Sequence, residues 1–219
     1  MKHDRYTTPL PRSSVLLTID VQEDFSRPGA AAEIRGTGKC IPAMKRVLEA
    51  YRELKLPIVH VVRLYLADGA NADICRREQI KAGRRIVAPG TRGAELVGHL
   101  KPDSDLELDA TLLLSGKLQP LAHREWAMYK PRWDAFFGTS LEAHLKTMHV
   151  DTVVIVGCNF PSCPRSTAYG ASMRDFRVML VADAVSGTYK RGLAELERIG
   201  VETPDAGKCL AWLRSERLK

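Results

Sequence analysis

Short, almost continuously apolar runs recur along this 219-residue chain and alternate with segments of helical spacing. Four of the runs are rich in β-branched residues: SVLLTID at 14–20, PIVHVVRL at 57–64, DTVVIVG at 151–157 and RVMLVADAV at 177–185. Strands that are buried on both faces of a sheet have this composition. Strands that alternate with helices build parallel sheets covered by those helices. The pattern therefore predicts an α/β fold around one parallel sheet.

The segments between these runs have the spacing of amphipathic helices. In IPAMKRVLEAYRELK at 41–55, apolar residues recur every three or four positions, as they do on one face of a helix. A short strand is expected just before Lys130. Further helices are expected within 90–102, over 139–150, 162–176 and 189–200, and at the end of 201–213 after a short strand.

The stretch 67–125 is the least regular part of the chain and is rich in Gly and Pro. Because the sequence shows no linker and no internal repeat, we predict a single domain over 1–219 in which 67–125 is an irregular insertion. Long irregular connections in compact domains often have a function. Two interpretations of this stretch are equally favoured: it covers a ligand site as a lid, or it forms a contact between subunits.

The composition is typical of a globular protein with reduced thiols. Apolar residues make up 45% and charged residues 27% of the chain, which is ordinary for a soluble domain. The N-terminal residues lack the apolar stretch of a signal peptide, and no apolar run is long enough to span a membrane. With five cysteines, an odd number, a cytoplasmic location is expected. The net charge of +7 is scattered without interleaved aromatic residues, so nucleic acid is not an expected partner.

Four polar residues lie at or just beyond the carboxyl ends of the predicted strands, on four separate segments. They are Asp20, Arg63, Lys130 and Cys163. In an open α/β sheet, ligands bind beyond the carboxyl ends of the strands. We therefore expect these four side chains to converge on one rim of the sheet.

Cys163 lies where a predicted strand turns into a helix, and its expected neighbours would make it a nucleophile. A helix N-terminus and the ammonium of Lys130 would lower the pKa of the thiol, and Asp20 could accept its proton. Backbone N–H groups of the same turn could bind an oxyanion. Other interpretations stay open from residue types alone: Cys163 as a small core residue, Asp20 as a turn former and Lys130 as surface charge.

Three segments together resemble the motifs of the isochorismatase-like cysteine hydrolase superfamily. LLTIDVQEDF resembles its first-strand motif, and YKPRWDAFFGTSLEAHL resembles its lysine motif. VIVGCNFPSCPRSTAYGASMRDFRVMLVADAVSG resembles its nucleophile motif and the strand that follows. Any one of these segments would be a weak signal, but all three occur in the family order over about residues 14–205.

The resemblance implies a fold, a catalytic triad and an oligomer. The implied fold is a Rossmann-like three-layer αβα sandwich with about six parallel strands in the order 3-2-1-4-5-6. In the implied triad, Asp20 is the general base, Lys130 the supporting cation and Cys163 the nucleophile. A cis peptide between Cys158 and Asn159 would turn the amide of Asn159 toward the oxyanion, beside the amide of Cys163. The resemblance also implies a homodimer or homotetramer.

The resemblance further implies a reaction, with departures that concern the substrate pocket. Nicotinamidases of the superfamily carry a histidine-containing metal site after the second strand, and VVRLYLADGANAD at 61–73 has no histidine. We therefore expect no metal and no cofactor. A cysteine nucleophile implies hydrolysis of a C–N bond in a small amide, carbamoyl or ureido compound, with release of ammonia or an amine. The departures from the usual pattern are Phe160, Pro161, Ser162, Pro164 and Gly170.

Five residues are candidates for binding the substrate: Phe25, Arg63, Trp133, Phe137 and Phe160. Arg63 could bind a substrate carboxylate, or it could be a surface or interface arginine. The aromatic residues could form pocket walls, or belong to the ordinary core. Three alternative functions also stay open: hydrolysis of another small metabolite, redox sensing by Cys158 and Cys163, and an inactive binding protein.

Overall fold

The computed structural model describes residues 4–215 and contains one six-stranded sheet with strand order β3-β4-β2-β1-β5-β6. Five strands are parallel: β1 Ser14–Ile19, β2 Ile58–Val62, β4 Glu125–Tyr129, β5 Thr152–Gly157 and β6 Arg177–Val185. The edge strand β3, Gln119–Ala122, runs antiparallel to β4. The predicted α/β class is confirmed.

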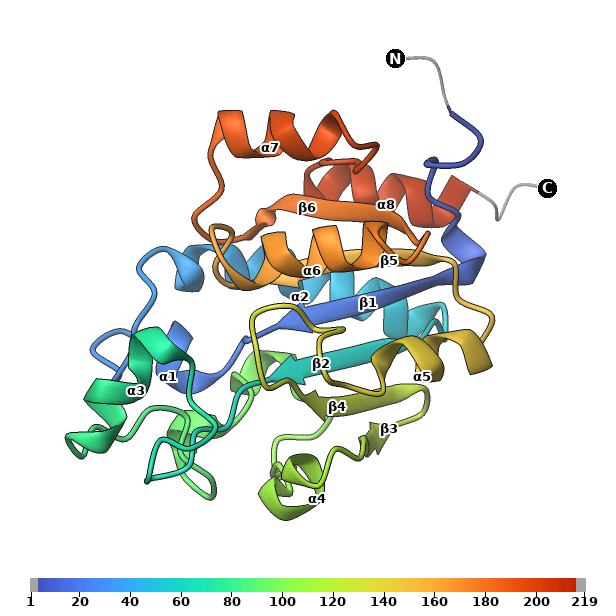
Figure 1. Cartoon of the computed structure of the whole chain (residues 1–219). Helices are drawn as coiled ribbons and strands as arrows, with labels where there is room; N and C mark the ends of the chain where they lie inside the picture. The colour runs from blue at the N-terminus through green and yellow to red at the C-terminus, as the bar shows by residue number, and fades with distance from the viewer. Residues whose placement is uncertain (1–3, 216–219) are drawn as a thin grey trace.

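Helices cover both faces of the sheet and make the three layers seen in Figure 1. On one face, α2 (Thr37–Glu53) and α8 (Ala206–Arg214) pack on the strands through one hydrophobic cluster. On the other face, α5 (Leu141–Thr147), α6 (Cys163–Ser172) and α7 (Lys190–Glu197) pack through a second cluster. The runs in β1 and β5 are fully buried because both of their faces lie against helices.

The five parallel strands lie in the order β4-β2-β1-β5-β6. When only these strands are numbered along the chain, this order is 3-2-1-4-5, which matches the first five positions of the predicted order 3-2-1-4-5-6. The expected sixth parallel strand is reduced to one bridge, in which Glu202 pairs with Met179 beside β6. Pro204 has no N–H and can only accept there, from Ala182 at 2.8 Å, so the pairing does not extend into a full strand. The sixth strand of the sheet is instead β3, whose sequence QPLA gives no strand signal.

The prediction of a helix within 90–102 is wrong. The structure has two 3₁₀ turns there, η2 (Arg92–Ala94) and η3 (Gly98–Leu100). The backbone between them pairs with the residues after β1: the N–H of Glu23 donates to the carbonyl of Glu95, and the N–H of Val97 donates to the carbonyl of Val21. These long-range hydrogen bonds replace the local ones that a helix would need.

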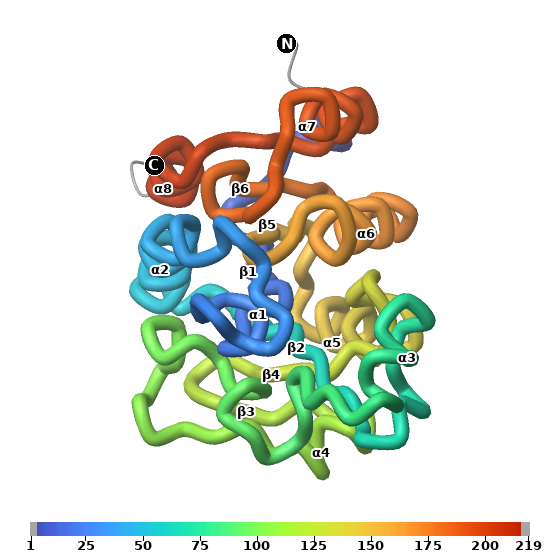
Figure 2. The backbone as a smooth tube through the Cα atoms, turned by 90° about the vertical axis from the view of Figure 1, so that its left-hand side faces the viewer, coloured from blue at the N-terminus to red at the C-terminus, as the bar shows by residue number. Residues whose placement is uncertain are grey.

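The remaining short elements lie near the carboxyl ends of the strands or at the N-terminus. They are η1 (Pro11–Ser13), α1 (Glu23–Ser26), α3 (Ile74–Lys81) and α4 (Ala110–Leu114). Figure 2 looks onto the carboxyl ends of the strands and shows α1 and α3 on this side of the molecule. A third hydrophobic cluster joins the insertion 67–125 to Phe25 of α1 and Val62 of β2. The insertion is thus packed against the rim on which a ligand site is expected.

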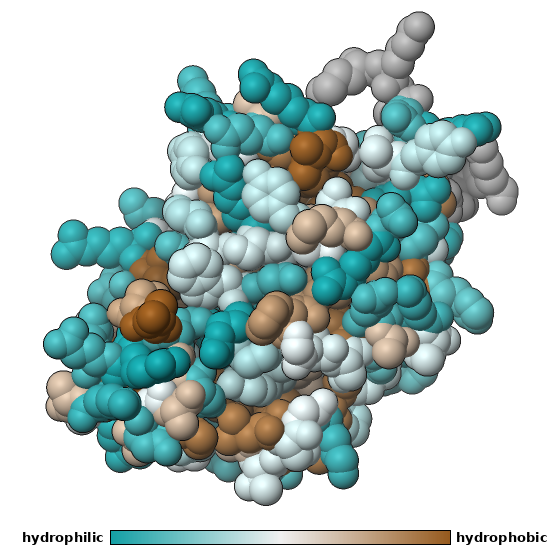
Figure 3. Space-filling view, viewed as in Figure 1, coloured by the Kyte–Doolittle hydropathy of each residue, from teal (hydrophilic) through white to brown (hydrophobic). Residues whose placement is uncertain are grey.

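The visible surface is largely hydrophilic (Figure 3). On the face shown in Figure 3, hydrophilic side chains predominate and hydrophobic ones form small separate patches. Within residues 4–215, every helix is too short or too polar to traverse a lipid bilayer.

A chain of buried polar side chains crosses three strands of the sheet. His60 of β2 lies 2.8 Å from the hydroxyl of Thr18 in β1 and 2.7 Å from the carboxylate of Glu125 in β4. Arg52 of α2 donates two hydrogen bonds to the same carboxylate, at 2.9 and 2.6 Å. Burial alone would raise the pKa of Glu125, but the hydrogen bonds from Arg52 and His60 outweigh it and lower the pKa to about 2.

We expect this network to stabilise the fold only above acidic pH. The folded pKa of Glu125 is depressed from 4.5 to about 2, so its contribution is complete above the unfolded pKa and is lost as the pH falls through this window. The contribution is at most about 3 kcal/mol. Urea unfolding of the wild type and Glu125→Gln checks this: the stability difference should shrink steadily from about pH 5 to pH 2. A difference that stays constant with pH would contradict it.

Candidate active site

Hydrogen bonds that continue the sheet ladder place the rim residues side by side. The N–H of Asp20 donates to the carbonyl of Val61 at 2.9 Å, and the N–H of Lys130 donates to that of Val62 at 3.0 Å. The N–H of Cys158 donates to the carbonyl of Ile19 at 2.9 Å. Each residue thus extends its strand by one step before the chain turns away, so the side chains meet at one edge.

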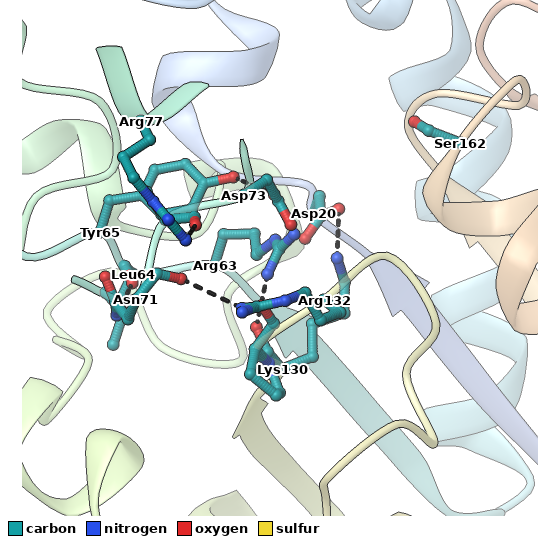
Figure 4. Close-up of polar contacts among 12 residues, drawn as sticks. Asp20, Arg63, Leu64, Tyr65, Asn71, Asp73, Arg77, Lys130, Arg132 and Ser162 are labelled. Carbon is teal, nitrogen blue, oxygen red and sulfur yellow. Dashed lines mark hydrogen bonds and ion pairs between the residues drawn. The ribbon is translucent and has the colours of Figure 1, made fainter. Parts of the chain in front are cut away.

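Asp20 and Lys130 form a buried ion pair, shown in Figure 4. Nζ of Lys130 donates to Oδ2 of Asp20 at 2.8 Å, and the lysine side chain is fully buried. Asp20 has a backbone φ of 54°, in the left-handed region that Asp tolerates better than most residues. Its second oxygen, Oδ1, is buried and has no hydrogen-bond partner among the described residues. One carboxylate oxygen is therefore held by the lysine and the other is available.

Cys163 is the first residue of α6 and is 8% exposed. Burial and then the charge of Asp20 raise the pKa of its thiol to about 12, although Lys130 and Arg63 act in the opposite direction. The sequence favours a lowered pKa at this helix N-terminus, and the structure gives the opposite direction because the sulfur is buried beside a carboxylate. The thiol is therefore protonated at neutral pH until a base removes its proton.

The turn that carries Cys163 has a fixed backbone and two free amides. The peptide between Cys158 and Asn159 is cis. The N–H of Phe160 donates to the carbonyl of Ser186 at 2.8 Å, and that of Ser162 to Asn159 at 3.1 Å. Within the described part of the chain, the N–H groups of Asn159 and Cys163 have no acceptor. These are the two amides that the family resemblance implies as donors to an oxyanion.

Gly157 allows this turn to approach the end of β1. Its φ is 127°, and a Cβ at this position would lie 2.2 Å from the carbonyl oxygen of Ile19. Only glycine satisfies both the conformation and the close contact. The backbone conformation and packing therefore require glycine at position 157, independently of any reaction at the site.

A cavity of about 240 Å³ opens beside the thiol and the carboxylate. Its volume is below the range of drug-sized ligand pockets, so it suits a small molecule. Asp20 and Cys163 share its wall with residues from several other segments. The lining residues are Asp20, Phe25, Ile34, Arg63, Tyr65, Asp73, Cys75, Arg76, Trp133, Cys158, Asn159, Ser162 and Cys163.

Three of the five predicted substrate-binding residues line this cavity: Phe25, Arg63 and Trp133. The other two do not. Phe160 is fully buried, with its ring 5.3 Å from that of Tyr189, so it belongs to the core behind the turn. Phe137 is 58% exposed and lies outside the cavity wall.

Arg63 is neither a surface residue nor an unpaired cation. Its side chain is buried, forms an ion pair with Asp73 and donates to the carbonyl of Lys130 at 3.0 Å. Its backbone is held by Gln22, whose amide group donates to the carbonyl of Arg63 at 2.8 Å and accepts from its N–H at 2.7 Å. The expected clamp for a substrate carboxylate is therefore already occupied by a protein carboxylate.

The structure adds cavity residues that sequence reasoning missed, mainly Tyr65, Asp73, Cys75 and Arg76. They follow β2, so the rule that ligands bind beyond the carboxyl ends of strands could have pointed to this stretch. Their spacing gave no further signal, because they belong to the irregular insertion. The second Asp of the pattern Asp-x-Gln-x-Asp-Phe also gains a structural reason here. Asp24 accepts a hydrogen bond from the N–H of Val87 at 2.7 Å and ties the insertion to α1.

Comparison with known proteins places the chain in a family. The family model of the isochorismatase domain matches residues 14–111 and 110–198. A probable inactive nicotinamidase of Arabidopsis thaliana is 29% identical over 199 residues, which cover 88% of this chain and 92% of that protein. A maleamate amidohydrolase of Pseudomonas putida is 39% identical over 175 residues, which cover 80% of this chain and 72% of that protein.

A solved structure agrees with these sequence relations. The crystal structure of an isochorismatase family protein from Desulfovibrio vulgaris superposes with a TM-score of 0.77 at 29% identity, covering 90% of this chain and 96% of that one. The match to the family model extends over most of the chain and includes the segments that carry Asp20, Lys130 and Cys163. The chain therefore belongs to the isochorismatase family.

Proposed function

We propose that this protein is a cysteine hydrolase that cleaves the C–N bond of a small amide, carbamoyl or ureido compound. One observation carries the proposal: the Cys163 thiol and the Asp20 carboxylate line the same small cavity, and Lys130 bonds to that carboxylate. An amidohydrolase among the relatives supports the C–N bond as the target. The residues needed for acyl transfer are all supplied by this chain.

The first half of the proposed reaction forms a thioester. Cys163 Sγ attacks the substrate carbonyl carbon while Asp20 accepts the thiol proton, and the carbonyl π electrons move to the oxygen. The oxyanion accepts hydrogen bonds from the N–H groups of Asn159 and Cys163. When the oxyanion collapses, the C–N bond breaks and Asp20 returns the proton to the nitrogen. Ammonia or an amine leaves, and the acyl group stays on the sulfur.

The second half hydrolyses the thioester. Water attacks the same carbonyl carbon while Asp20 accepts one of its protons. The C–S bond then breaks, and the proton on Asp20 goes to the departing sulfur. The product is a carboxylic acid, or a carbamic acid when the substrate is a carbamoyl or ureido compound. The carboxylate and the thiol are both regenerated, so no further reactant is needed.

Lys130 and Arg63 influence this reaction through their charge. Both cations lower the pKa of the Cys163 thiol, against burial and the charge of Asp20. Once Asp20 has taken the proton, its charge no longer opposes the thiolate, while the two cations remain. The arrangement thus favours the thiolate at the moment when the carboxylate is neutral.

The proposed hydrolase activity is tested by measuring the release of ammonia from small amides, N-carbamoyl amino acids and ureido acids. Turnover should fall to background in Cys163→Ala because the nucleophile is absent. Cys75→Ala is the matched control, because Cys75 lines the same cavity and yet is exposed and has no role in the reaction. Activity that survives in Cys163→Ala, or disappears equally in Cys75→Ala, would contradict the proposal.

The structure weakens the alternative of a redox pair formed by Cys158 and Cys163. Cys158 is buried, and its thiol donates to the carbonyl of Asp20 at 3.0 Å. Burial and then the charge of Asp20 raise its pKa well above the ordinary value. Redox-sensing cysteines are accessible thiolates of low pKa, and neither thiol of this pair has that character.

A further inference from the structure

The charges around the cavity do not balance. Four charged side chains line it: Asp20, Arg63, Asp73 and Arg76. Asp20 is paired with Lys130 behind the cavity wall, and Asp73 is paired with Arg63. The guanidinium of Arg76 is left, and it makes no hydrogen bond or ion pair with any residue between 4 and 215. One positive charge therefore remains on the cavity wall without a protein partner.

Asp73 explains why Arg63 cannot be that free cation. It occupies the N-cap position of α3, yet its side chain does not cap the helix. The carboxylate instead forms the ion pair with Arg63 and accepts a hydrogen bond from the hydroxyl of Tyr65 at 2.7 Å. Figure 4 shows the three side chains directed toward one another. Arg63 is thus paired with a protein carboxylate and held in place.

Arg76 stands on the first turn of the same helix, where its N–H donates to the carbonyl of Asp73 at 2.9 Å. Its guanidinium carbon lies 5.6 Å from the centre of the Phe25 ring, a position that orients the group without neutralising it. The side chain is partly exposed, whereas Arg63 is buried. A guanidinium presents paired N–H donors that match the two oxygens of a carboxylate.

We propose that Arg76 binds a carboxylate of the substrate, so that the enzyme acts on small acids that also carry an amide, carbamoyl or ureido group. The reaction in this statement rests on the proposed function, whereas the anion site does not. The substrate carboxylate would complete the charge balance of the cavity. Because the cavity is small, its volume of about 240 Å³ limits the acid to a short chain between the carboxylate and the scissile carbonyl. Arg76 would be the specificity-determining residue, and Arg63 a positioning residue.

The anion site is tested by adding succinate to the ¹⁵N-labelled full-length protein. The Nε–Hε signal of Arg76 is identified as the one missing in Arg76→Gln. We expect succinate to shift this signal and to bind about tenfold or more weakly to Arg76→Gln, with part of the affinity retained in Arg76→Lys. Neutral succinamide should bind equally to the wild type and Arg76→Gln.

Arg77→Gln is the matched control, because Arg77 is the adjacent arginine of α3 and does not line the cavity. Its succinate affinity should equal that of the wild type. Succinate binding that is absent in the wild type, or equal in the wild type and Arg76→Gln, would overturn the anion site.

Hydrolysis of succinamate and of neutral butanamide separates this inference from the proposed function. We expect the wild type to prefer succinamate, and Arg76→Gln to raise the KM for succinamate alone. If butanamide is hydrolysed as well as succinamate, the hydrolase stands and the role of Arg76 is wrong. If neither is hydrolysed while succinate still binds through Arg76, the anion site stands and the proposed reaction fails.

Discussion

Replacing Asp20 with Asn is expected to abolish hydrolysis and, at the same time, to make the Cys163 thiol easier to alkylate. Hydrolysis should fall about 10²- to 10⁴-fold, because no group remains to accept and return the proton. The charge of Asp20 raises the pKa of Cys163, so the loss of this charge must lower that pKa. Each unit of decrease gives up to about tenfold more thiolate at neutral pH.

The measurement is the rate at which iodoacetamide modifies each cysteine between about pH 6 and pH 10, followed by peptide mass spectrometry. Cys75 is an internal control, since its thiol is exposed and carries none of the interactions with Asp20. In the wild type, Cys163 should react more slowly than Cys75 because burial and Asp20 hold its pKa at about 12. An Asp20→Asn protein in which Cys163 reacts no faster than before would show that the carboxylate does not control the thiol.

That Asp20, Lys130 and Cys163 lie on one rim of the sheet could be predicted because each follows a strong local pattern. Asp20 and Lys130 come directly after strands, and Cys163 begins the helix that follows the end of β5. The ladder of a parallel sheet brings the ends of its strands together. The direction of the Cys163 pKa could not be predicted in the same way. A helix N-terminus is visible in the sequence, whereas the depth of burial depends on how segments far apart in the chain pack around Cys163. Here burial is the larger effect.

Asp73 and Arg76 were missed for a related reason. They lie in the insertion, where neither alternation nor helical spacing fixes the position of a side chain, and only the packing of α3 on the rim directs them into the cavity. Phe160 was predicted to contact the substrate, but it does not line the cavity. It is close to Cys163 in sequence, but the turn directs its ring into the core beneath α7, where it meets Tyr189. Proximity in sequence to a nucleophile does not place a residue in the pocket.

The unusual Gly170 also acquires a reason only in three dimensions. A Cβ at this position of α6 would lie 2.4 Å from Oδ1 of Asp134, so the space of a side chain is already taken by that carboxylate. The resemblance expects an Asp in this helix, and here an acidic side chain reaches the same region from the segment after β4. The departure at Gly170 is thus linked to Asp134, a relation between two distant segments that no local pattern contains.

Replacing Lys130 with Met is expected to cost about 3–5 kcal/mol of unfolding free energy and to remove hydrolysis. The ammonium is fully buried, and its partner Asp20 is 3% exposed. Without the lysine, a buried carboxylate has lost its counter-charge, and removal of one partner of such a pair is strongly destabilising. Met fills a similar volume, so a cavity contributes little to the loss. Urea unfolding gives the free energy, and ammonia release gives the activity.

The double variant Asp20→Asn/Lys130→Met separates charge from packing. It contains no unpaired buried charge, so its stability should recover most of what Lys130→Met loses, because a buried ion pair contributes little net stability compared with neutral groups of similar size. Its activity should remain absent, since neither the base nor the cation is present. A double variant as unstable as Lys130→Met would attribute the loss to packing around residue 130. The expected opposite behaviour of stability and activity would mean that the buried pair is retained for its chemistry rather than for the stability of the fold.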